Sequence, residues 1–290
     1  MFMNKKQYIF LDVDGTLVTP QGLFPESAQT ALKEAQANGN EIFICTGRCK
    51  YKVHEELQNF GFDGFVAATG EYADYHDEIV NKQTFSEKTA NDIFYMFKQL
   101  NTPFMIETET DVIFPSWTLI KFAECYLGYE PKGKTLEDLI EMNVPFLPSL
   151  MPITVDDDID SYTKKYKDIF NINYVQCTTT IDKVRKLLPK EARVEQASFK
   201  ATDLYSGEIT LEGCYKARGI KQILDYVGAS QEQCIVVGDG PNDKDMMEFG
   251  HISIAMGNAI PEIKKLANYV TTEILDDGIY NAFKHYKLIQ

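Results

Sequence analysis

Short apolar runs alternate with longer amphipathic segments over the first 70 residues of the chain. Runs of four or five apolar residues fit buried strands, whereas longer segments with one apolar face fit helices. Pro25 and Gly39 suit the first turn and the position just past the end of one such helix. The expected strands are residues 8–11, 41–45 and 65–68, and the expected helices are residues 25–38 and 48–60. Apolar strands joined by helices predict a parallel sheet that is covered on both faces.

The same alternation returns near the end of the chain, with expected strands at 234–237, 252–255 and 269–272 and expected helices at 217–227 and 260–267. The middle of the chain differs, because the runs 104–107 and 111–114 are typical of a hairpin and are followed by mixed helices and strands. We therefore predict an α/β fold in which a Rossmann-like parallel-sheet core carries an inserted α+β domain. The predicted division is core at residues 1–83 and 207–290 and insertion at residues 84–206.

Composition narrows the possible partners. A chain of 290 residues with 44% hydrophobic residues can bury the cores of two domains. Its formal net charge of −14 disfavours nucleic acid and anionic membranes, because binding to either depends on clustered Lys and Arg. A small phosphorylated ligand remains compatible with this charge, since a metal ion can reverse the field within one cleft. No sequence feature indicates an obligate protein partner.

The spacing of the cysteines and the first residues of the chain indicate the cellular compartment of the protein. The six cysteines are too scattered for a CxxC metal site and too sparse for a disulfide scaffold, so we expect them to be reduced. The apolar run at residues 8–11 is too short for a signal-peptide core or a membrane span. These features predict a cytoplasmic protein.

Acids, glycines and a hydroxyl collect where three predicted strands end. The segments concerned are Asp-Val-Asp-Gly-Thr at 12–16, Thr-Gly-Arg at 46–48 and Gly-Asp-Gly-Pro-Asn-Asp at 238–243. Open parallel sheets bind ligands beyond the carboxyl ends of their strands. The first motif alone is compatible with a simple turn, because Asp and Gly are common turn residues. A second acidic strand end more than 200 residues away favours a site, since converging oxygen ligands suit a hard cation such as Mg²⁺.

Together with Lys216, these motifs resemble those of haloacid dehalogenase (HAD) superfamily phosphatases, specifically the Cof-type subgroup with a large α/β cap. The resemblance covers the whole chain in layout. It implies an Mg²⁺-dependent phosphomonoesterase that acts on sugar phosphates or similar small metabolites through an aspartyl-phosphate intermediate. The expected partner is therefore a small phosphorylated metabolite.

The resemblance also implies a division of roles between two acids. Asp12 would be the nucleophile, and Asp14 would act as general acid toward the leaving oxygen and later as base toward water. The chemistry agrees, because a carboxylate can attack phosphorus and a second acid two residues along is close enough to share the site. The implied ligands of Mg²⁺ are Asp12, Asp14 through its backbone carbonyl, Asp239 and Asp243, the last directly or in support.

Other motif residues are expected to hold the phosphoryl group, whose negative charge would repel an attacking carboxylate. The expected residues are Thr46, Gly47, Arg48, Lys216 and Asn242. Several have a simpler alternative. Lys216 could be a solvated lysine, Thr46 a helix N-cap and Asp243 a first-turn acid. Arg48 could equally lie on the surface.

Two segments depart from the Cof-type pattern. Thr69-Gly70-Glu71 replaces a common Asn-Gly-Ala, and Lys216 is followed by Ala217-Arg218-Gly219 in place of glycine. The departures concern the expected substrate contacts and leave the expected catalytic core intact. Trp117, Phe122 and Tyr126 are candidates for lining the entrance of the cap, although aromatic residues at helical spacing more often pack in a core.

Two other functions use the same aspartyl chemistry. A phosphotransferase or sugar-phosphate mutase would pass the phosphoryl group to a second substrate instead of water. A phosphate-binding regulatory protein would accept the group without turnover, and the completeness of the motif set disfavours it. A dinucleotide-binding domain is weaker still, because no GxGxxG follows the first strand.

Overall fold

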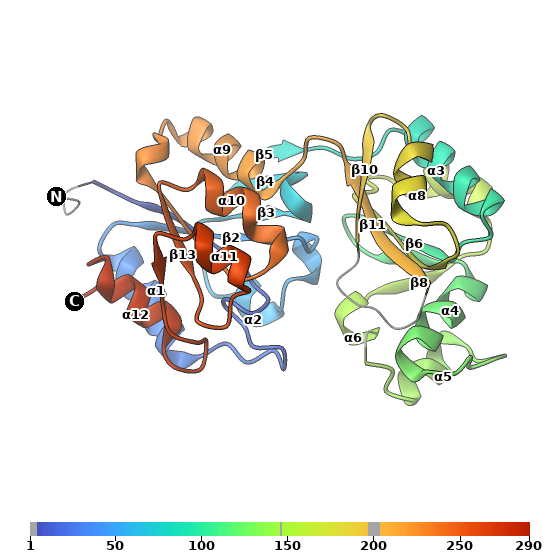
Figure 1. Ribbon diagram of the computed structural model, residues 1–290, viewed down its shortest axis with the longest axis horizontal. Helices are drawn as coiled ribbons and strands as arrows, with labels where there is room; N and C mark the ends of the chain where they lie inside the picture. The colour runs from blue at the N-terminus through green and yellow to red at the C-terminus, as the bar shows by residue number, and fades with distance from the viewer. Residues whose placement is uncertain (1–4, 146, 197–203) are drawn as a thin grey trace. The chain divides into compact units, whose positions relative to one another are not determined.

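The structure is a computed structural model that describes residues 5–145, 147–196 and 204–290. The chain divides into two compact units (Figure 1). The core unit comprises residues up to Lys82 together with Cys214–Gln290, and the inserted unit comprises Gln83–Gly213. The sequence-based boundary after residue 206 falls within strand β11 (Tyr205–Leu211).

The core unit contains an eight-stranded sheet in the order β14-β13-β12-β1-β2-β3-β4-β5. The first six strands of this order pair in parallel, and β4 and β5 are antiparallel at one edge. The strands are β1 Tyr8–Leu11, β2 Glu41–Cys45, β3 Gly64–Ala67, β4 Tyr72–Tyr75, β5 Glu78–Lys82, β12 Cys234–Gly238, β13 Ile252–Ala255 and β14 Tyr269–Val270. The predicted α/β fold with a parallel-rich core sheet is confirmed.

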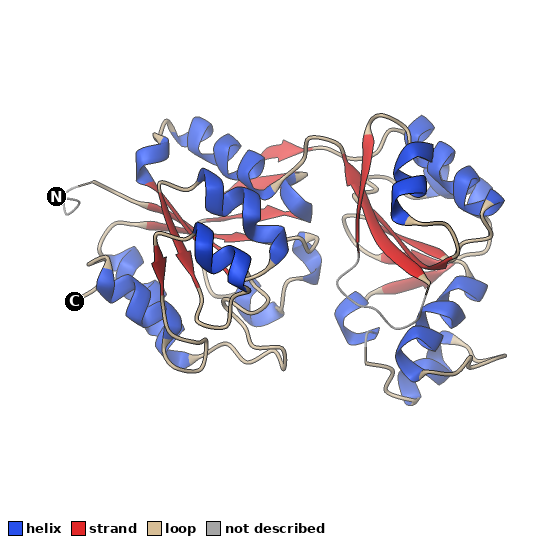
Figure 2. Ribbon diagram, in the orientation of Figure 1, coloured by secondary structure: helices blue, strands red, loops and turns tan. Residues whose placement is uncertain are grey.

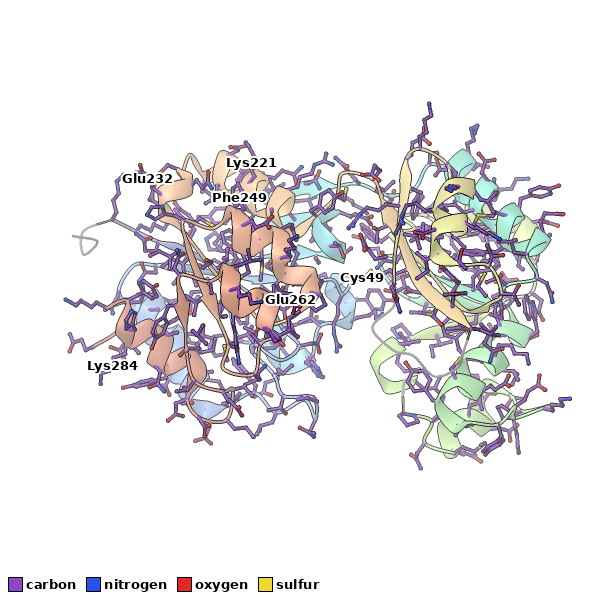
Figure 3. The ribbon with its side chains drawn as sticks, viewed as in Figure 1. Cys49, Lys221, Glu232, Phe249, Glu262 and Lys284 are labelled. Carbon is purple, nitrogen blue, oxygen red and sulfur yellow. The ribbon has the colours of Figure 1, made fainter. Side chains whose placement is uncertain are left out.

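Helices cover both faces of this sheet (Figure 2). Successive residues of a strand point to opposite faces, so each buried strand packs against helices on both sides. Ile9 and Leu11 pack with apolar residues of α1, α2 and α12, whereas Tyr8 and Phe10 pack with those of α9, α10 and α11. Charged helix residues such as Lys221 are exposed (Figure 3). The helices are α1 Glu26–Ala37, α2 Glu55–Gln58, α9 Lys216–Val227, α10 Lys244–Phe249, α11 Pro261–Leu266 and α12 Gly278–His285.

The helix predicted over residues 48–60 is wrong in extent. The structure has a 3₁₀ turn at Lys50–Lys52 and only a short helix, α2. Side chains donate hydrogen bonds to backbone carbonyls that would accept intrahelical hydrogen bonds in a continuous helix. Arg48 donates to Lys52 O at 3.2 Å, and Gln58 donates to Val53 O at 2.6 Å. Local side-chain hydrogen bonds of this kind compete with the helical ladder.

The inserted unit contains a six-stranded mixed sheet in the order β10-β11-β9-β6-β7-β8. Its strands are β6 Phe104–Glu107, β7 Val112–Phe114, β8 Ile153–Val155, β9 Asn171–Cys177, β10 Ala192–Gln196 and β11. Strands β6 and β7 form the predicted antiparallel hairpin. Its helices are α3 Glu87–Gln99, α4 Ser116–Leu127, α5 Leu136–Glu141, α6 Leu147–Leu150, α7 Tyr162–Lys165 and α8 Ile181–Leu187.

The aromatic residues singled out in α4 have different surroundings. Phe122 is buried, and its ring meets that of Phe114 edge-on at 5.2 Å between centroids. Trp117 and Tyr126 are exposed at 42% and 40%. Phe122 therefore belongs to the packing of the inserted unit. Within the described ranges, no helix has both the length and the apolar character needed to cross a bilayer.

Candidate active site

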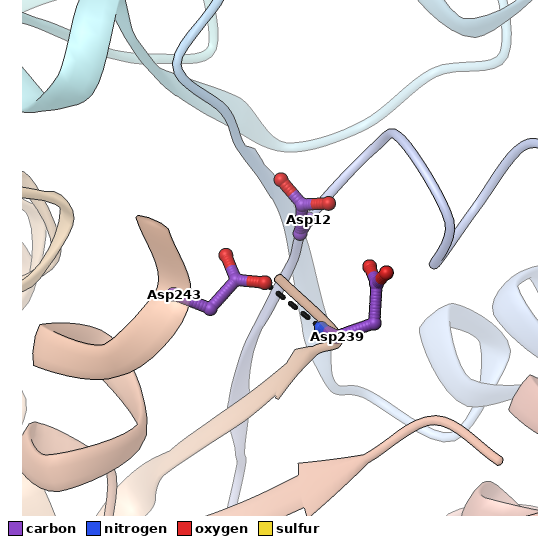
Figure 4. A group of neighbouring side chains, drawn as sticks. All are labelled: Asp12, Asp239 and Asp243. Carbon is purple, nitrogen blue, oxygen red and sulfur yellow. Dashed lines mark hydrogen bonds between the residues drawn. The ribbon is translucent and has the colours of Figure 1, made fainter. Parts of the chain in front are cut away.

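Three aspartates converge at the carboxyl ends of β1 and β12 (Figure 4). Leu11 lies opposite Val237 in the parallel pair, so the residues that follow these strands leave the sheet at the same edge. Asp12 follows β1, and Asp239 follows β12. Together with Asp243 they each place one carboxylate oxygen within 4.8 Å of the others. The structure thus brings together three of the four expected metal ligands by their side chains.

Lys216 lies among these acids. It is the first residue of α9 and is fully buried. Its Nζ donates to Asp12 Oδ1 and to Asp243 Oδ1, both at 2.6 Å. A solvated surface lysine is therefore excluded as the explanation for this residue.

Asp243 shapes the loop that follows β12. Its Oδ2 accepts hydrogen bonds from the backbone N–H groups of Asp239, at 2.8 Å, and Gly240, at 2.9 Å. Gly238 leaves room for this carboxylate, because a Cβ there would lie 2.6 Å from Asp243 Oδ2. One oxygen of Asp243 thus closes the loop, and the other binds Lys216.

The turn after β1 is in close contact with the Asp239 side chain. Gly15 has a φ of +89°, and a Cβ at this position would lie 2.4 Å from Asp239 Oδ2. Thr16 Oγ1 donates to Asp239 Oδ1 at 2.9 Å, and Asn258 Nδ2 holds the carbonyl of Gly15 at 2.8 Å. Thr16 lies inside the first motif and Asn258 lies outside all three motifs, and the motif pattern predicts neither contact.

Burial and mutual repulsion change the acidity of this cluster. Burial raises the pKa of Asp12 to about 8, and the Asp243 carboxylate adds to this rise while Lys216 opposes it. Burial also raises the pKa of Asp239 to about 6, against the hydrogen bond from Thr16. For Lys216, burial favours the neutral amine, but the neighbouring Asp12 and Asp243 carboxylates hold its pKa well above the usual value.

The donor set fits a divalent cation. Three carboxylates face one ammonium group, which leaves an excess of negative charge in a poorly solvated place. Oxygen donors from carboxylates are the ligands that hard cations such as Mg²⁺ prefer. Asp12, Asp239 and Asp243 could therefore hold such an ion.

The second motif lies beside the loop after β12. Thr46 is buried, and its Oγ1 accepts the backbone N–H of Arg48 at 3.1 Å, so it closes a local turn instead of capping a helix. A Cβ at Gly47 would lie 3.7 Å from Asn242 Nδ2 and 3.6 Å from Thr69 Oγ1. Gly47 and Asn242 are therefore neighbours, and Thr69, from one of the departing segments, lies next to them.

Arg48 contacts the other acid of the first motif. Its Nε donates to Asp14 Oδ2 at 2.7 Å, and its second terminal nitrogen donates to Asp14 Oδ1 at 2.6 Å. The Asp14 side chain is 52% exposed, in contrast to the buried Asp12. In this structure the guanidinium group thus pairs with Asp14 in a bidentate geometry.

The fold and the site define an α/β enzyme with a buried carboxylate and lysine centre at the strand ends. The family model for haloacid dehalogenase-like hydrolases matches residues 9–283, and the chain belongs to this family. The predicted family is confirmed, and the protein is a phosphatase of the HAD type.

Several known proteins are similar over nearly the full chain. The putative phosphatase YkrA of Bacillus subtilis is 26% identical, with 97% of this chain and 98% of the relative covered. The 5-amino-6-(5-phospho-D-ribitylamino)uracil phosphatase YcsE of the same organism is 23% identical, covering 97% and 95%. The solved structure of the HAD subclass IIB sugar phosphatase BT4131 shares the fold with a TM-score of 0.74 at 23% identity, covering 98% and 100%.

The raised pKa values of Asp12 and Asp239 predict a pH-dependent affinity for metal. Without metal, Asp12 and Asp239 hold protons below their pKa values of about 8 and about 6, and a cation must displace these protons. The apparent affinity for Mg²⁺ should therefore rise with pH, by up to about tenfold per pH unit for each proton displaced, and level off above both pKa values. Calorimetric titration in buffers of different ionisation enthalpy counts the released protons. An affinity that stays constant between pH 5.5 and 8.5, a range of about three units, would contradict this assignment.

Two glycine substitutions separate backbone strain from crowding at Asp239. Gly15 and Gly39 have φ values of +89° and +88°, but a Cβ at Gly39 meets nothing within 4 Å. Backbone strain should lower the free energy of unfolding of Gly15→Ala and of Gly39→Ala by about 1–2 kcal/mol each, and crowding at Asp239 should add to the loss in Gly15→Ala. Only Gly15→Ala should also weaken Mg²⁺ binding, because its Cβ displaces the Asp239 carboxylate. Equal metal affinity of the two variants would show that Asp239 accommodates the methyl group.

Proposed function

We propose that the protein hydrolyses small phosphomonoesters in the presence of Mg²⁺ and transiently phosphorylates Asp12. The observation that carries this proposal is the setting of the Asp12 carboxylate. It is buried, bonded to the Lys216 ammonium at 2.6 Å, and within 4.8 Å of a carboxylate oxygen of Asp239 and of Asp243. A carboxylate held in this way can form a covalent intermediate that divides a difficult hydrolysis into two easier steps.

Mg²⁺ would be held by the Asp12 carboxylate, the Asp14 backbone carbonyl and the Asp239 carboxylate. When bound, it supplies positive charge that offsets the repulsion between the attacking carboxylate and the phosphate. Asp243 already uses one oxygen for the loop and the other for Lys216. This favours a role for Asp243 in supporting the metal ligands over direct ligation.

Lys216 and the second motif would hold the transferring phosphoryl group. At about 4 Å and an effective dielectric of about 20, two like unit charges repel by about 4 kcal/mol, so cations near the phosphate are needed. The Lys216 ammonium is one such cation. Thr46, the backbone at Gly47, and Asn242, which neighbours Gly47, would donate hydrogen bonds to the equatorial oxygens.

Asp14 would serve as general acid and then as general base. Its half-exposed carboxylate bonds to Arg48 through both oxygens, so it must exchange at least one of these bonds for the leaving-group oxygen. The glycine that follows Asp14 gives the backbone freedom there. Proton transfer of this kind typically contributes about 10²–10⁴-fold. Arg48 would become available to contact phosphate once Asp14 turns away.

Asp12→Asn tests the nucleophile with little change in shape. Turnover of 4-nitrophenyl phosphate should fall by at least about 10³-fold, because the neutral amide cannot form the acyl phosphate. Wild-type protein quenched during turnover should carry phosphate that hydroxylamine removes, and the variant should carry none. Asp225→Asn, on the exposed side of α9, is a matched control. Near wild-type activity of Asp12→Asn would refute the assignment of Asp12.

Sugar phosphates and related polyhydroxylated phosphomonoesters are the proposed substrates. Among the similar proteins, BT4131 is described as a sugar phosphatase, and YcsE acts on a phosphoribityl compound. The inserted domain, residues 84–206 in the predicted division, would act as the cap that selects among such substrates. The exposed aromatic residues Trp117 and Tyr126 remain candidates for contacts at its entrance.

A panel of phosphorylated sugars, nucleotides and cofactors tests this substrate class. We expect kcat/KM to be highest for a sugar phosphate or phosphorylated polyol, with phosphate released stoichiometrically to water. Isomerised sugar phosphate without free phosphate would instead indicate a mutase. Release of one equivalent or less, with a persistent phosphoprotein, would indicate a regulatory phosphate-binding protein.

A further inference from the structure

The position of Lys216 depends on how the start of α9 is fixed. Lys216 is the first residue of this helix, and its Nζ reaches two carboxylates at 2.6 Å. The first N–H groups of a helix have no partner within the helix, and a capping side chain normally binds one of them. The N-cap residue here is Tyr215, which is not a type that caps helices.

An acid from a neighbouring helix takes this role. Asp245 of α10 accepts the backbone N–H of Ala217 through Oδ2 at 2.7 Å. A carboxylate at the amino end of a helix is also favoured by the helix dipole. Asp243 lies two residues before Asp245 in the chain and binds the Lys216 ammonium. The start of α9 is thus held twice from one side, through its backbone by Asp245 and through the lysine side chain by Asp243.

The first turn of α9 is also held by close packing against the core sheet. A Cβ at Gly219 would lie 2.4 Å from Val66 Cγ1 of β3 and 3.2 Å from the Cα of Gly70. The helix therefore lies directly against the end of β3, with no room to move toward it. On the side that faces α10, the hydrogen bond between Asp245 and Ala217 fixes the backbone of the first turn.

We propose that Asp245 is a positioning residue for the phosphatase reaction. Its hydrogen bond to Ala217 fixes the first turn of α9 and thereby holds the Lys216 ammonium at the place where the phosphoryl group is transferred. This inference rests on the proposed role of Lys216. The bond uses a backbone N–H, which any residue other than proline supplies, so alanine at position 217 is compatible with it.

A purely stabilising role predicts a different result. Loss of a stabilising hydrogen bond lowers the unfolding temperature but leaves the geometry of the folded site, and therefore kcat, unchanged. Loss of a positioning bond moves the ammonium group, and a misplacement of about 1 Å can cost up to about 10²-fold in rate. Because the ammonium group acts on the transferring group more than on the bound ester, kcat should change and KM should not.

The test compares Asp245→Ala, Asp245→Leu and Asp245→Asn on the full chain with Mg²⁺ and 4-nitrophenyl phosphate. Alanine and leucine remove the acceptor, and leucine keeps the branched skeleton of four side-chain heavy atoms, so it replaces alanine if that variant does not fold. Both should lower kcat between about 10- and 100-fold, with KM within about twofold. Asparagine retains an acceptor oxygen and should remain within about threefold of wild type.

Inhibition by orthovanadate and inorganic phosphate gives a second readout. Vanadate adopts the five-coordinate geometry of the transferring phosphoryl group, so its inhibition constant should rise in parallel with the loss in kcat, while that of phosphate changes little. Glu248→Gln, an exposed acid on α10 that pairs with Lys244, is the matched control and should match wild type. Unfolding temperatures of all variants separate folding from catalysis.

Three results would overturn the proposal. The first is a kcat of the folded alanine or leucine variant within twofold of wild type. The second is an asparagine variant as impaired as leucine, and the third is a rise in KM at constant kcat. A wild-type protein without phosphatase activity would instead refute the proposed function itself, so the two failures are distinguishable.

Discussion

The buried contact between the Lys216 ammonium and the carboxylates of Asp12 and Asp243 is the interaction on which the rest of the site depends. Removing these charges from water is costly, and an unpaired charge at this depth would be strongly destabilising. The contact is made at 2.6 Å on both sides by groups from three separate segments of the chain. The ends of β1 and β12 and the start of α9 must therefore all be placed before any phosphate arrives.

The sheet topology provides this placement. Strands β1 and β12 are more than 200 residues apart in sequence but are direct neighbours in parallel register, so their carboxyl ends share one edge. Glycines allow the loops there to approach closely: Gly15 lies against Asp239, and Gly238 lies against Asp243. The inserted unit interrupts the sequence between these strands without entering the core sheet.

Much of this arrangement was predictable from sequence, because buried parallel strands are continuous apolar runs and their ends carry the motifs. Contacts made by side chains between elements were not. Nothing in the spacing indicated that Arg48 would pair with Asp14, or that Asp245 would bind the backbone of Ala217. The short α2 was missed for a similar reason, since side-chain bonds to backbone carbonyls interrupt a helix that its apolar periodicity favours.

The first motif places two carboxylates two residues apart in opposite environments. The Asp12 side chain is 6% exposed and bonded to a buried lysine, whereas the Asp14 side chain is 52% exposed and bonded to an arginine that is itself partly solvated. The difference arises because the strand ends at Leu11 and the chain turns at Gly15, so Asp12 stays at the buried end of the strand and Asp14 lies in the turn. In the proposed reaction this contrast suits the two roles. A nucleophile benefits from a fixed position beside cations, and a proton carrier needs freedom to move between the leaving group and water.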